Sequence, residues 1–235
     1  EKYKSLGGTC LNVGCIPSKS LLDSSHHYDD IMNHAVNHGI EISGEINLNF
    51  NKMIERKNGV VNQTVKGIDY LMNKNNITVF EGKASFVDDK TIKVSENKEN
   101  IIFDKCIIAT GSKPISLPFI ELDKKRVITS TEALSLKEIP KHLVIIGGGV
   151  IGLELGQVYN RLGSEVTVIE YSDKITPFMD NDISRELLKI LKKQKIKFYL
   201  SHQVYEVDNK GKNIIVKAKN KNNEIINFDC DYCLV

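Results

Sequence analysis

Two cysteines separated by four residues carry the first recognisable chemistry of this chain. The segment "GGTCLNVGCIPSK" (residues 7–19) places Cys10 and Cys15 between glycine pairs and a Pro-Ser-Lys run. Zinc is one use, with His26 and His27 as further ligands, but zinc sites usually pair cysteines at closer spacing and adjacent histidines rarely face one ion. A structural disulfide is a second use, although so short a ring constrains little of the unfolded chain.

A third use, thiol–disulfide exchange, fits the neighbouring residues best. Pro17 suits the first turn of a helix, which would place Cys15 at the helix N-terminus. The helix dipole stabilises a thiolate there, and Lys19, one turn further on, adds positive charge. Exchange requires one stabilised thiolate and a partner that can be exposed. A pair that cycles between dithiol and disulfide is therefore the favoured interpretation.

A glycine-rich turn supplies the second chemistry. "IIGGGVIG" (residues 145–152) holds Gly147-x-Gly149-x-x-Gly152 directly after an apolar run and at the start of a predicted helix. Such glycines allow close approach to a pyrophosphate, and the helix N-terminus offers free N–H groups. Glu170 ends the next strand, where a carboxylate would hold ribose hydroxyls and repel a 2′-phosphate. The pattern predicts NAD rather than NADP; a strand-end glutamate beside a packing turn is the alternative.

Helices and strands must position these residues. The clearest pattern is β-α-β: a strand over 142–146, a helix over 150–162 and a strand over 165–170. Before it, short β-type runs are separated by polar turns, and two prolines and a charged cluster suggest a linker over 112–125. The other predicted helices cover 18–30, 50–73 and 182–193, and the other strands cover 77–80, 84–87, 91–94 and 101–110.

Composition limits the class of protein. The 235 residues leave room for one large domain or two ordinary ones, and the net charge is only +2. Lysines alternate with acidic residues, which does not indicate a nucleic-acid or membrane-surface partner. The longest apolar run, 143–153, is shorter than the ~20 residues that cross a bilayer. Five cysteines are too few for a disulfide scaffold, which favours a reducing compartment.

The segment "GGTCLNVGCIPSK" resembles the redox-active segment of the pyridine nucleotide-disulfide oxidoreductases, and within them the dihydrolipoamide dehydrogenases. "IIATGSKP" (residues 107–114) is similar to the family's second flavin-contacting turn, and residues 130–170 are similar to its NAD domain. Glutathione reductases usually carry lysine where Ser18 stands and bind NADP through arginines that are missing here. Mercuric reductases share the Pro-Ser-Lys run. The resemblance covers nearly the whole chain and favours lipoamide as substrate.

The resemblance implies an α/β fold with two Rossmann-like dinucleotide-binding domains of the glutathione-reductase type, truncated at both ends. Residues 1–118 would form a partial FAD-binding domain with the redox-active disulfide, and residues 119–235 an NAD-binding domain incomplete at its C-terminus. A first FAD glycine motif and a C-terminal interface domain, whose His-Glu pair acts across a dimer, are expected outside this chain. The chain alone is therefore expected to be inactive.

The resemblance also implies a role for each candidate residue. Cys10 would form the mixed disulfide with the substrate, and Cys15 would lie against the flavin and pass electrons to it. Lys19 would lie near the flavin N5, paired with Glu154. Further contacts are expected to FAD from Gly82, Thr110, Gly111 and Ser112, and to NAD from Gly147, Gly148, Gly149, Val150, Ile151, Gly152, Glu154, Glu170 and Val204. A plain turn at Gly82 and a plain core position at Val204 are the alternatives.

The implied activity is the oxidation of protein-bound dihydrolipoamide to lipoamide, with FAD as cofactor and NAD+ as final acceptor. The implied partners are the lipoyl domain of a 2-oxoacid dehydrogenase or glycine cleavage complex and a second copy in a homodimer. No nucleic acid and no membrane are expected. The expected compartment is the bacterial cytoplasm, or the mitochondrial matrix in a eukaryote. The alternatives are a mercuric or glutathione type of reductase, or an NAD-binding module whose cysteines sense redox state or metal.

Other eye-catching residues have simpler interpretations. Cys230 and Cys233 form a C-x-x-C, but it lies in a predicted strand, so core and edge positions are expected. Cys106 precedes an apolar run and is expected to be buried. The histidines on or near predicted helices are expected at the surface; these are His26, His27, His34 and His38.

Overall fold

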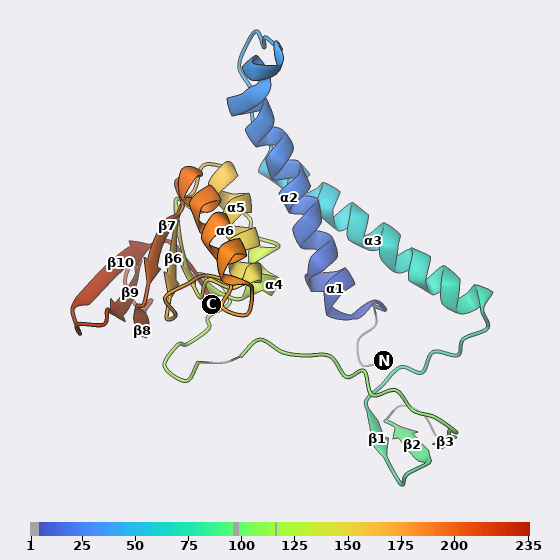
Figure 1. Ribbon diagram of the computed structural model, residues 1–235. Helices are drawn as coiled ribbons and strands as arrows, with labels where there is room; N and C mark the ends of the chain where they lie inside the picture. Colours follow the sequence, from blue (N-terminus) through green and yellow to red (C-terminus); the bar gives the residue numbers. More distant parts are fainter. Residues whose placement is uncertain (1–4, 96–98, 116) are drawn as a thin grey trace. The chain divides into compact units, whose positions relative to one another are not determined.

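The computed structural model describes residues 5–95, 99–115 and 117–235 (Figure 1). The chain divides into two compact units. One comprises residues 1–17 and 58–113, and the other comprises residues 18–57 and 114–235. The predicted domain boundary at residue 118 stays a prediction.

A parallel five-stranded sheet organises the second unit. Its order is β4-β11-β5-β6-β7, with β4 at Val127–Ile128, β11 at Tyr232–Leu234, β5 at His142–Ile146, β6 at Glu165–Glu170 and β7 at Lys197–Leu200. Helix α5 (Val150–Arg161) joins β5 to β6, and α6 (Asn181–Lys193) joins β6 to β7. Parallel strands need such crossovers, and the predicted β-α-β segment is confirmed.

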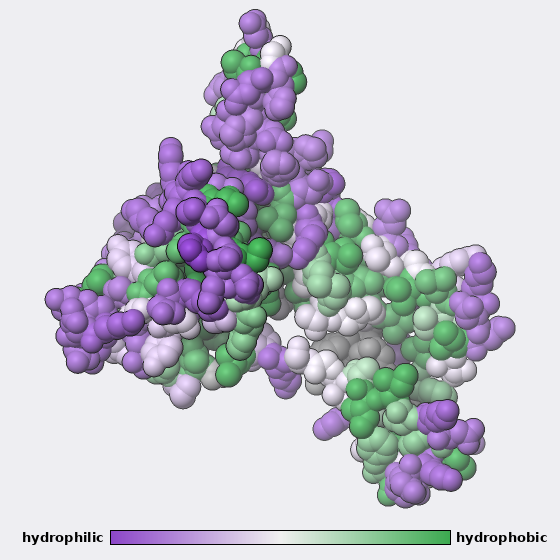
Figure 2. Space-filling view, in the orientation of Figure 1, coloured by the Kyte–Doolittle hydropathy of each residue, from purple (hydrophilic) through white to green (hydrophobic). Residues whose placement is uncertain are grey.

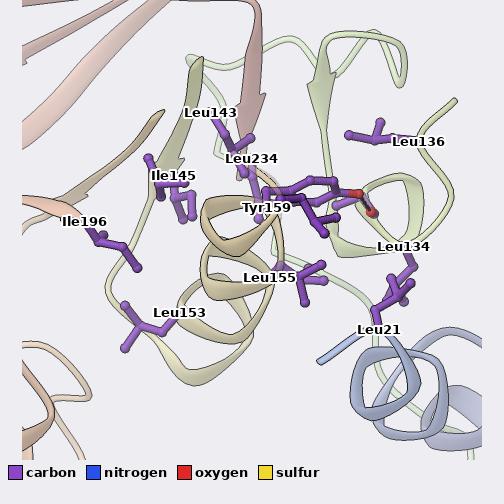
Figure 3. Packing of buried hydrophobic residues seen from close by; sticks show 14 of the residues in the cluster. Leu21, Leu134, Leu136, Leu143, Ile145, Leu153, Leu155, Tyr159, Ile196 and Leu234 are labelled. Carbon is purple, nitrogen blue, oxygen red and sulfur yellow. Dashed lines mark hydrogen bonds between the residues drawn. The ribbon is translucent and has the colours of Figure 1, made fainter. Parts of the chain in front are cut away.

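One face of this sheet packs against helices. Alternate residues of a strand point to opposite faces, and Leu143 and Ile145 of β5 point to the helical side. Tyr159 of α5 is completely buried among them, and its hydroxyl donates a hydrogen bond to the carbonyl oxygen of Ala133. Figure 3 shows these side chains together with Leu21 of helix α2, which enters the same core. The short helix α4 (Ser130–Ala133) begins with a capping box.

The other face of the parallel sheet packs against an antiparallel sheet. This second sheet has the order β10-β9-β8, with β8 at Gln203–Asp208, β9 at Ile214–Lys219 and β10 at Ile225–Cys230. Val144 and Ile169 lie in one apolar cluster with Val204, Ile214 and Val216. The sheet that holds the glycine turn is therefore covered on both faces, as parallel sheets require.

Two long helices, α2 and α3, each belong to the second unit only in part, over the residues that fall within 18–57. Helix α2 spans Cys15–Asp29 and continues as η1 (Asp30–His34) and η2 (Ala35–His38), and helix α3 spans Phe50–Lys74. Arg56 of α3 donates hydrogen bonds to the carbonyl oxygen of Ser20 at 3.2 Å and to Asp23 at 2.9 Å. The predicted helices over 18–30 and 50–73 are confirmed.

The first unit holds α1 (Gly8–Val13), the rest of α3 and a three-stranded antiparallel sheet. The order of that sheet is β1-β2-β3, with β1 at Ala84–Phe86, β2 at Thr91–Val94 and β3 at Ile101–Ile102. In Figure 2, apolar residues gather on the surface in this region. The α/β fold class with a parallel sheet is confirmed by the molecule as a whole.

Two predicted strands of the first unit are wrong or shortened. Residues 77–80 form no strand, and the predicted strand over 101–110 is limited to its first two residues. Ile107 and Ile108 are 91% and 69% exposed. An apolar run becomes a strand only where another strand pairs with its backbone groups. Within the described ranges, no strand pairs with 77–80 or with 103–110.

Candidate active site and nucleotide-binding site

Gly14 forms the turn between the two cysteine-bearing helices. Cys10 lies in α1, and α2 begins at Cys15. A Cβ atom on Gly14 would lie 2.8 Å from the Thr9 carbonyl oxygen and 3.1 Å from the Cys10 Cα. Backbone cannot yield at such distances, so this position requires glycine. The turn thus leads directly from α1 into α2, and both cysteines are exposed to solvent.

Cys15 stands at the start of α2, with Pro17 in the first turn. The first N–H groups of a helix have no partner within the helix, and the dipole there favours negative charge. Both features stabilise a thiolate relative to a thiol. The predicted position of Cys15 at a helix N-terminus is confirmed, while its redox role stays a prediction.

Asn12 fixes the loop before α1, which sequence reasoning missed. Its Nδ2 donates to the carbonyl oxygens of Leu6 at 3.1 Å and Gly8 at 2.9 Å, and its Oδ1 accepts from the Ser5 hydroxyl at 2.7 Å. An asparagine inside a helix usually competes for backbone groups, and that tendency was the available signal. Asn12 therefore supports the backbone on which Cys10 stands.

Lys19 and Glu154 form an ion pair inside the second unit. The Lys19 Nζ donates to Glu154 Oε1 at 2.7 Å and to Oε2 at 2.8 Å, and the Ser18 hydroxyl donates to Oε2 at 3.3 Å. The side chain of Lys19 is 59% exposed and that of Glu154 only 22% exposed. The structure thus brings together, from α2 and α5, the two charges whose pairing the resemblance implied. Their place beside a flavin stays a prediction.

The glycine turn has the geometry that a phosphate cradle needs. Gly147 has a φ of +104°, a left-handed conformation that side chains rarely adopt. Gly149 precedes the first residue of α5, whose early N–H groups are available to an anion. A Cβ atom on Gly152 would lie 2.8 Å from Ile145 Cγ2, so this glycine lets the helix pack closely on β5. These three positions meet the backbone requirements of a dinucleotide fingerprint.

Glu170 lies at the end of β6, directly beside this turn. Its Oε2 accepts a hydrogen bond from the Gly148 N–H at 2.6 Å, and its Oε1 accepts one from the Ser172 N–H at 2.7 Å. The residue is buried to 8% exposure. Val150 and Ile151, in the first turn of α5, are exposed near the same end of the sheet. The carboxylate is thus oriented before any ligand arrives.

The remaining predicted contact residues belong to both units. Gly82 and Gly111 have φ values of +132° and +76°, and Thr110 and Ser112 are exposed beside Gly111. All four belong to the first unit, with Cys10 and Cys15. Val204 belongs to the second unit and is 7% exposed in the core between the two sheets. The contacts of these residues with cofactors stay predictions.

The three other cysteines differ in their surroundings. Cys230 and Cys233 are buried, as predicted. Burial raises the pKa of the Cys230 thiol to about 12 and that of the Cys233 thiol well above its ordinary value. The prediction for Cys106 is wrong, because this residue is exposed, and no strand among the described residues pairs with its segment. Burial thus keeps the C-x-x-C pair protonated and unreactive.

Residues 5–95, 99–115 and 117–235 hold neither a cluster of metal ligands nor a membrane-spanning helix. No three or more His, Cys, Asp or Glu residues are grouped so that they could hold a metal ion there. None of the helices described is both long and apolar enough to cross a membrane. The predicted surface histidines are on the surface, and His26, His27 and His34 each lie within 4.0 Å of an aspartate.

The family model for pyridine nucleotide-disulphide oxidoreductases matches residues 3–235. The chain belongs to this family. It is 44% identical over 223 residues to the dihydrolipoamide dehydrogenase of Chaetomium thermophilum, covering 93% of this chain and 44% of the relative. It is 41% identical over 240 residues to the mitochondrial dihydrolipoyl dehydrogenase of Schizosaccharomyces pombe, covering 100% of this chain and 47% of that protein.

A solved structure of a flavoprotein disulfide reductase is also similar to this chain. The HOCl-induced flavoprotein disulfide reductase RclA of Escherichia coli superposes with a TM-score of 0.79 at 30% identity, covering 100% of this chain and 49% of that one. The chain is also 45% identical to a Glycine max protein named leghemoglobin reductase, covering 90% of this chain and 41% of that protein. The chain spans less than half the length of these relatives.

Proposed function

We propose that this chain carries the redox-active cysteine pair and the NAD site of a flavin-dependent dihydrolipoyl dehydrogenase. The observation that carries the proposal is the pair of exposed cysteines on consecutive helices, the second at a helix N-terminus. It is supported by 41–45% identity to several proteins named as dihydrolipoyl dehydrogenases. The cysteine pair supplies the chemistry, and the glycine turn supplies a nucleotide site.

The proposed exchange starts from a Cys10–Cys15 disulfide. A thiolate of the dihydrolipoyl group attacks the Cys10 sulfur, a mixed disulfide forms, and Cys15 leaves as a thiolate stabilised by the N-terminus of α2. The second substrate thiol loses its proton and attacks the substrate sulfur of the mixed disulfide. The lipoyl ring then closes and Cys10 leaves as a thiolate. Two electrons have moved from the substrate to the cysteine pair.

Residues of this chain would contact both cofactors. Bound FAD would accept the electron pair from the dithiol, and bound NAD+ would accept it from FAD as a hydride. Lys19 and Glu154 would hold the flavin ring, with a positive charge exposed to it and a carboxylate that keeps the lysine in place. The N–H groups at the start of α5 would hold the NAD pyrophosphate, and Glu170 the adenosine ribose.

The partners and the compartment are part of the same proposal. A lipoyl domain of a 2-oxoacid dehydrogenase or glycine cleavage complex would deliver the substrate, and the whole protein would work as a homodimer. Relatives from Schizosaccharomyces pombe and Arabidopsis thaliana are named as mitochondrial, which supports the matrix over the bacterial cytoplasm. The expectation that the 235-residue chain alone is catalytically inactive stays a prediction.

An absorbance spectrum and a turnover assay test this proposal together. The full-length protein should show flavin bands and should reduce NAD+ with dihydrolipoamide, but not with glutathione. Reduction of mercuric ion or oxidised glutathione at a higher rate would favour another reductase of the family. A colourless protein that binds zinc through its cysteines would instead support the sensor alternative.

A further inference from the structure

The parallel sheet of the second unit is rich in lysine at one end. All five strands run in the same direction, so they begin at the same edge of the sheet, and α6 ends at that edge before the chain enters β7. Lysines precede β4 and β5, occupy the last turn of α6 and stand in the turn before β7. Lys197, at the start of β7, pairs with Glu165. The other exposed lysines of these segments are named here the basic edge: Lys124, Lys125, Lys141, Lys192, Lys193 and Lys195.

The fold collects these lysines from segments that are far apart in the sequence. The net charge of the whole chain is only +2, and lysines alternate with acidic residues along it. In the folded second unit, carboxylates stand at the opposite end of the same strands. Glu170 ends β6 there, Asp180 caps α6 and Asp182 lies in its first turn. The small net charge therefore conceals a surface of high positive charge.

The acidic residues at the basic edge are bonded to its backbone. Asp231 accepts a hydrogen bond from the Lys141 N–H at 2.8 Å, and Asp123 accepts one from the Lys125 N–H at 2.8 Å. These carboxylates order the chain that carries the lysines. Within the part of the chain that the structure describes, no lysine of the basic edge forms an ion pair with a carboxylate. Their amino groups are thus free to meet an external negative charge.

Helix dipoles explain only part of this pattern. Cations at a helix C-terminus are stabilised by the dipole, which accounts for Lys192 and Lys193 in the last turn of α6. Lys124, Lys125 and Lys141 instead precede strands, whose dipoles are small. Like charges gathered on one surface repel one another and reduce stability. A negatively charged partner would remove that repulsion.

We propose that the basic edge binds an acidic surface of another protein. The segments that carry its lysines, 123–126, 141 and 191–196, contain no aromatic residue, whereas sites for single-stranded nucleic acid add aromatic rings that stack on bases. Their apolar members, Leu191 and Ile196, are buried, so they offer nothing to insert into a membrane. Exposed lysines without such neighbours suit carboxylates on a protein surface.

The position of the basic edge leaves the nucleotide site accessible. The glycine turn follows the end of β5, and Lys141 precedes the start of the same strand. A partner bound at the basic edge would therefore lie at the other end of the sheet from the glycine turn. This inference goes beyond the proposed function and does not depend on the substrate of the cysteine pair.

Cross-linking to poly-L-glutamate tests the location of the binding surface. A carbodiimide joins a lysine amine to a carboxylate only where the two groups touch. In the full-length protein, the cross-links that fall within these 235 residues should concentrate on the six lysines of the basic edge. They should disappear at high salt, because exposed charges are screened. Cross-links spread evenly over the exposed lysines of the chain would overturn the proposal.

Two charge-reversal variants of the full-length protein separate position from net charge. Lys141→Glu combined with Lys192→Glu should weaken binding of poly-L-glutamate at low salt by roughly tenfold. The matched control combines Lys219→Glu with Lys221→Glu, at the end of β9 and in the turn after it, and it changes the net charge equally. The control should bind almost as the wild type does, and thermal unfolding should verify that both variants fold.

Other outcomes would contradict the proposal. Equal weakening in the two variants would mean that net charge alone attracts the polymer and that the basic edge is no binding surface. Duplex DNA or phosphatidylserine vesicles that bind through the same lysines more tightly than poly-L-glutamate would overturn the choice of an acidic protein as partner. The cross-linking map uses the wild type, so it decides the location even if the Lys141→Glu, Lys192→Glu variant does not fold.

Discussion

Replacing Glu170 tests the nucleotide site most sharply, because this carboxylate has two tasks. It accepts hydrogen bonds from Gly148 and Ser172 at 2.6 and 2.7 Å, and it is proposed to accept them from the adenosine ribose. Loss of a charged hydrogen bond costs ~1.5–3 kcal/mol, and each 1.4 kcal/mol is about tenfold in affinity. Glu170→Ala should therefore weaken NAD binding by roughly one to two decades.

The same substitution leaves the Gly148 N–H beside the cradle without its acceptor. An unsatisfied buried donor costs about 1–3 kcal/mol, so the free energy of unfolding should fall by a similar amount. Glu170→Gln separates the two tasks, because its amide oxygen can still accept from the backbone while the charge is gone. The Glu170→Gln variant should lose less stability than Glu170→Ala. Its preference for NADP relative to NAD should nevertheless rise.

The assay is kcat/KM for NAD+ and NADP+ in the full-length protein, with thermal unfolding measured in parallel. NADP+ should improve relative to NAD+ in both variants, but it should stay weak because no arginine follows Glu170 in residues 171–184. Glu165→Gln is the matched control, since Glu165 stands at the opposite end of β6 and is bonded to Lys197. A wild type that prefers NADP+, or an alanine variant with its full NAD+ preference, would refute the placement of Glu170 on the ribose.

Three further predictions concern the cysteines and the ion pair. In the full-length protein, Cys10→Ser and Cys15→Ser should each abolish dihydrolipoamide turnover, because each thiol performs a separate step. Glu154→Gln should shift the flavin potential and slow flavin reduction while FAD stays bound, because the paired lysine loses its counter-charge. Cys230 and Cys233 should not react with a thiol reagent at pH 8 until the protein unfolds, and their contribution to stability should fall as pH rises from about 9 toward 12.

Each of these predictions has an outcome that would contradict it. Near-wild-type turnover in either serine variant would end the dithiol interpretation. An unchanged flavin potential in Glu154→Gln would mean that the ion pair does not face the flavin. The pH dependence follows because the buried thiol of Cys230 keeps its proton up to about 12, whereas an unfolded thiol loses it near 9. Rapid labelling of the buried pair in the native protein would contradict the burial argument, with exposed Cys106 as the positive control.

The sequence by itself determined the features that depend on neighbouring residues. The start of α2 at Cys15 follows from Pro17, and the start of α5 follows from the glycine turn after an apolar strand. The carboxylate of Glu170 could be placed because a β-α-β unit fixes where its second strand ends. The segment of residues 7–19 resembled the redox-active segment of the family closely enough to indicate the family before any fold was known.

Tertiary structure alone decided the features that depend on distant partners. Residues 77–80 and 103–110 have strand-forming sequences, yet they form no strand, because strands exist only where a second backbone supplies hydrogen bonds. The exposure of Cys106 follows from the same cause. The left-handed backbone of Thr176 was also invisible in the sequence, since it is held by Gly148, on the turn before α5, and by Ser184 of α6. Local propensity disfavours that conformation, and only packing against those two elements enforces it.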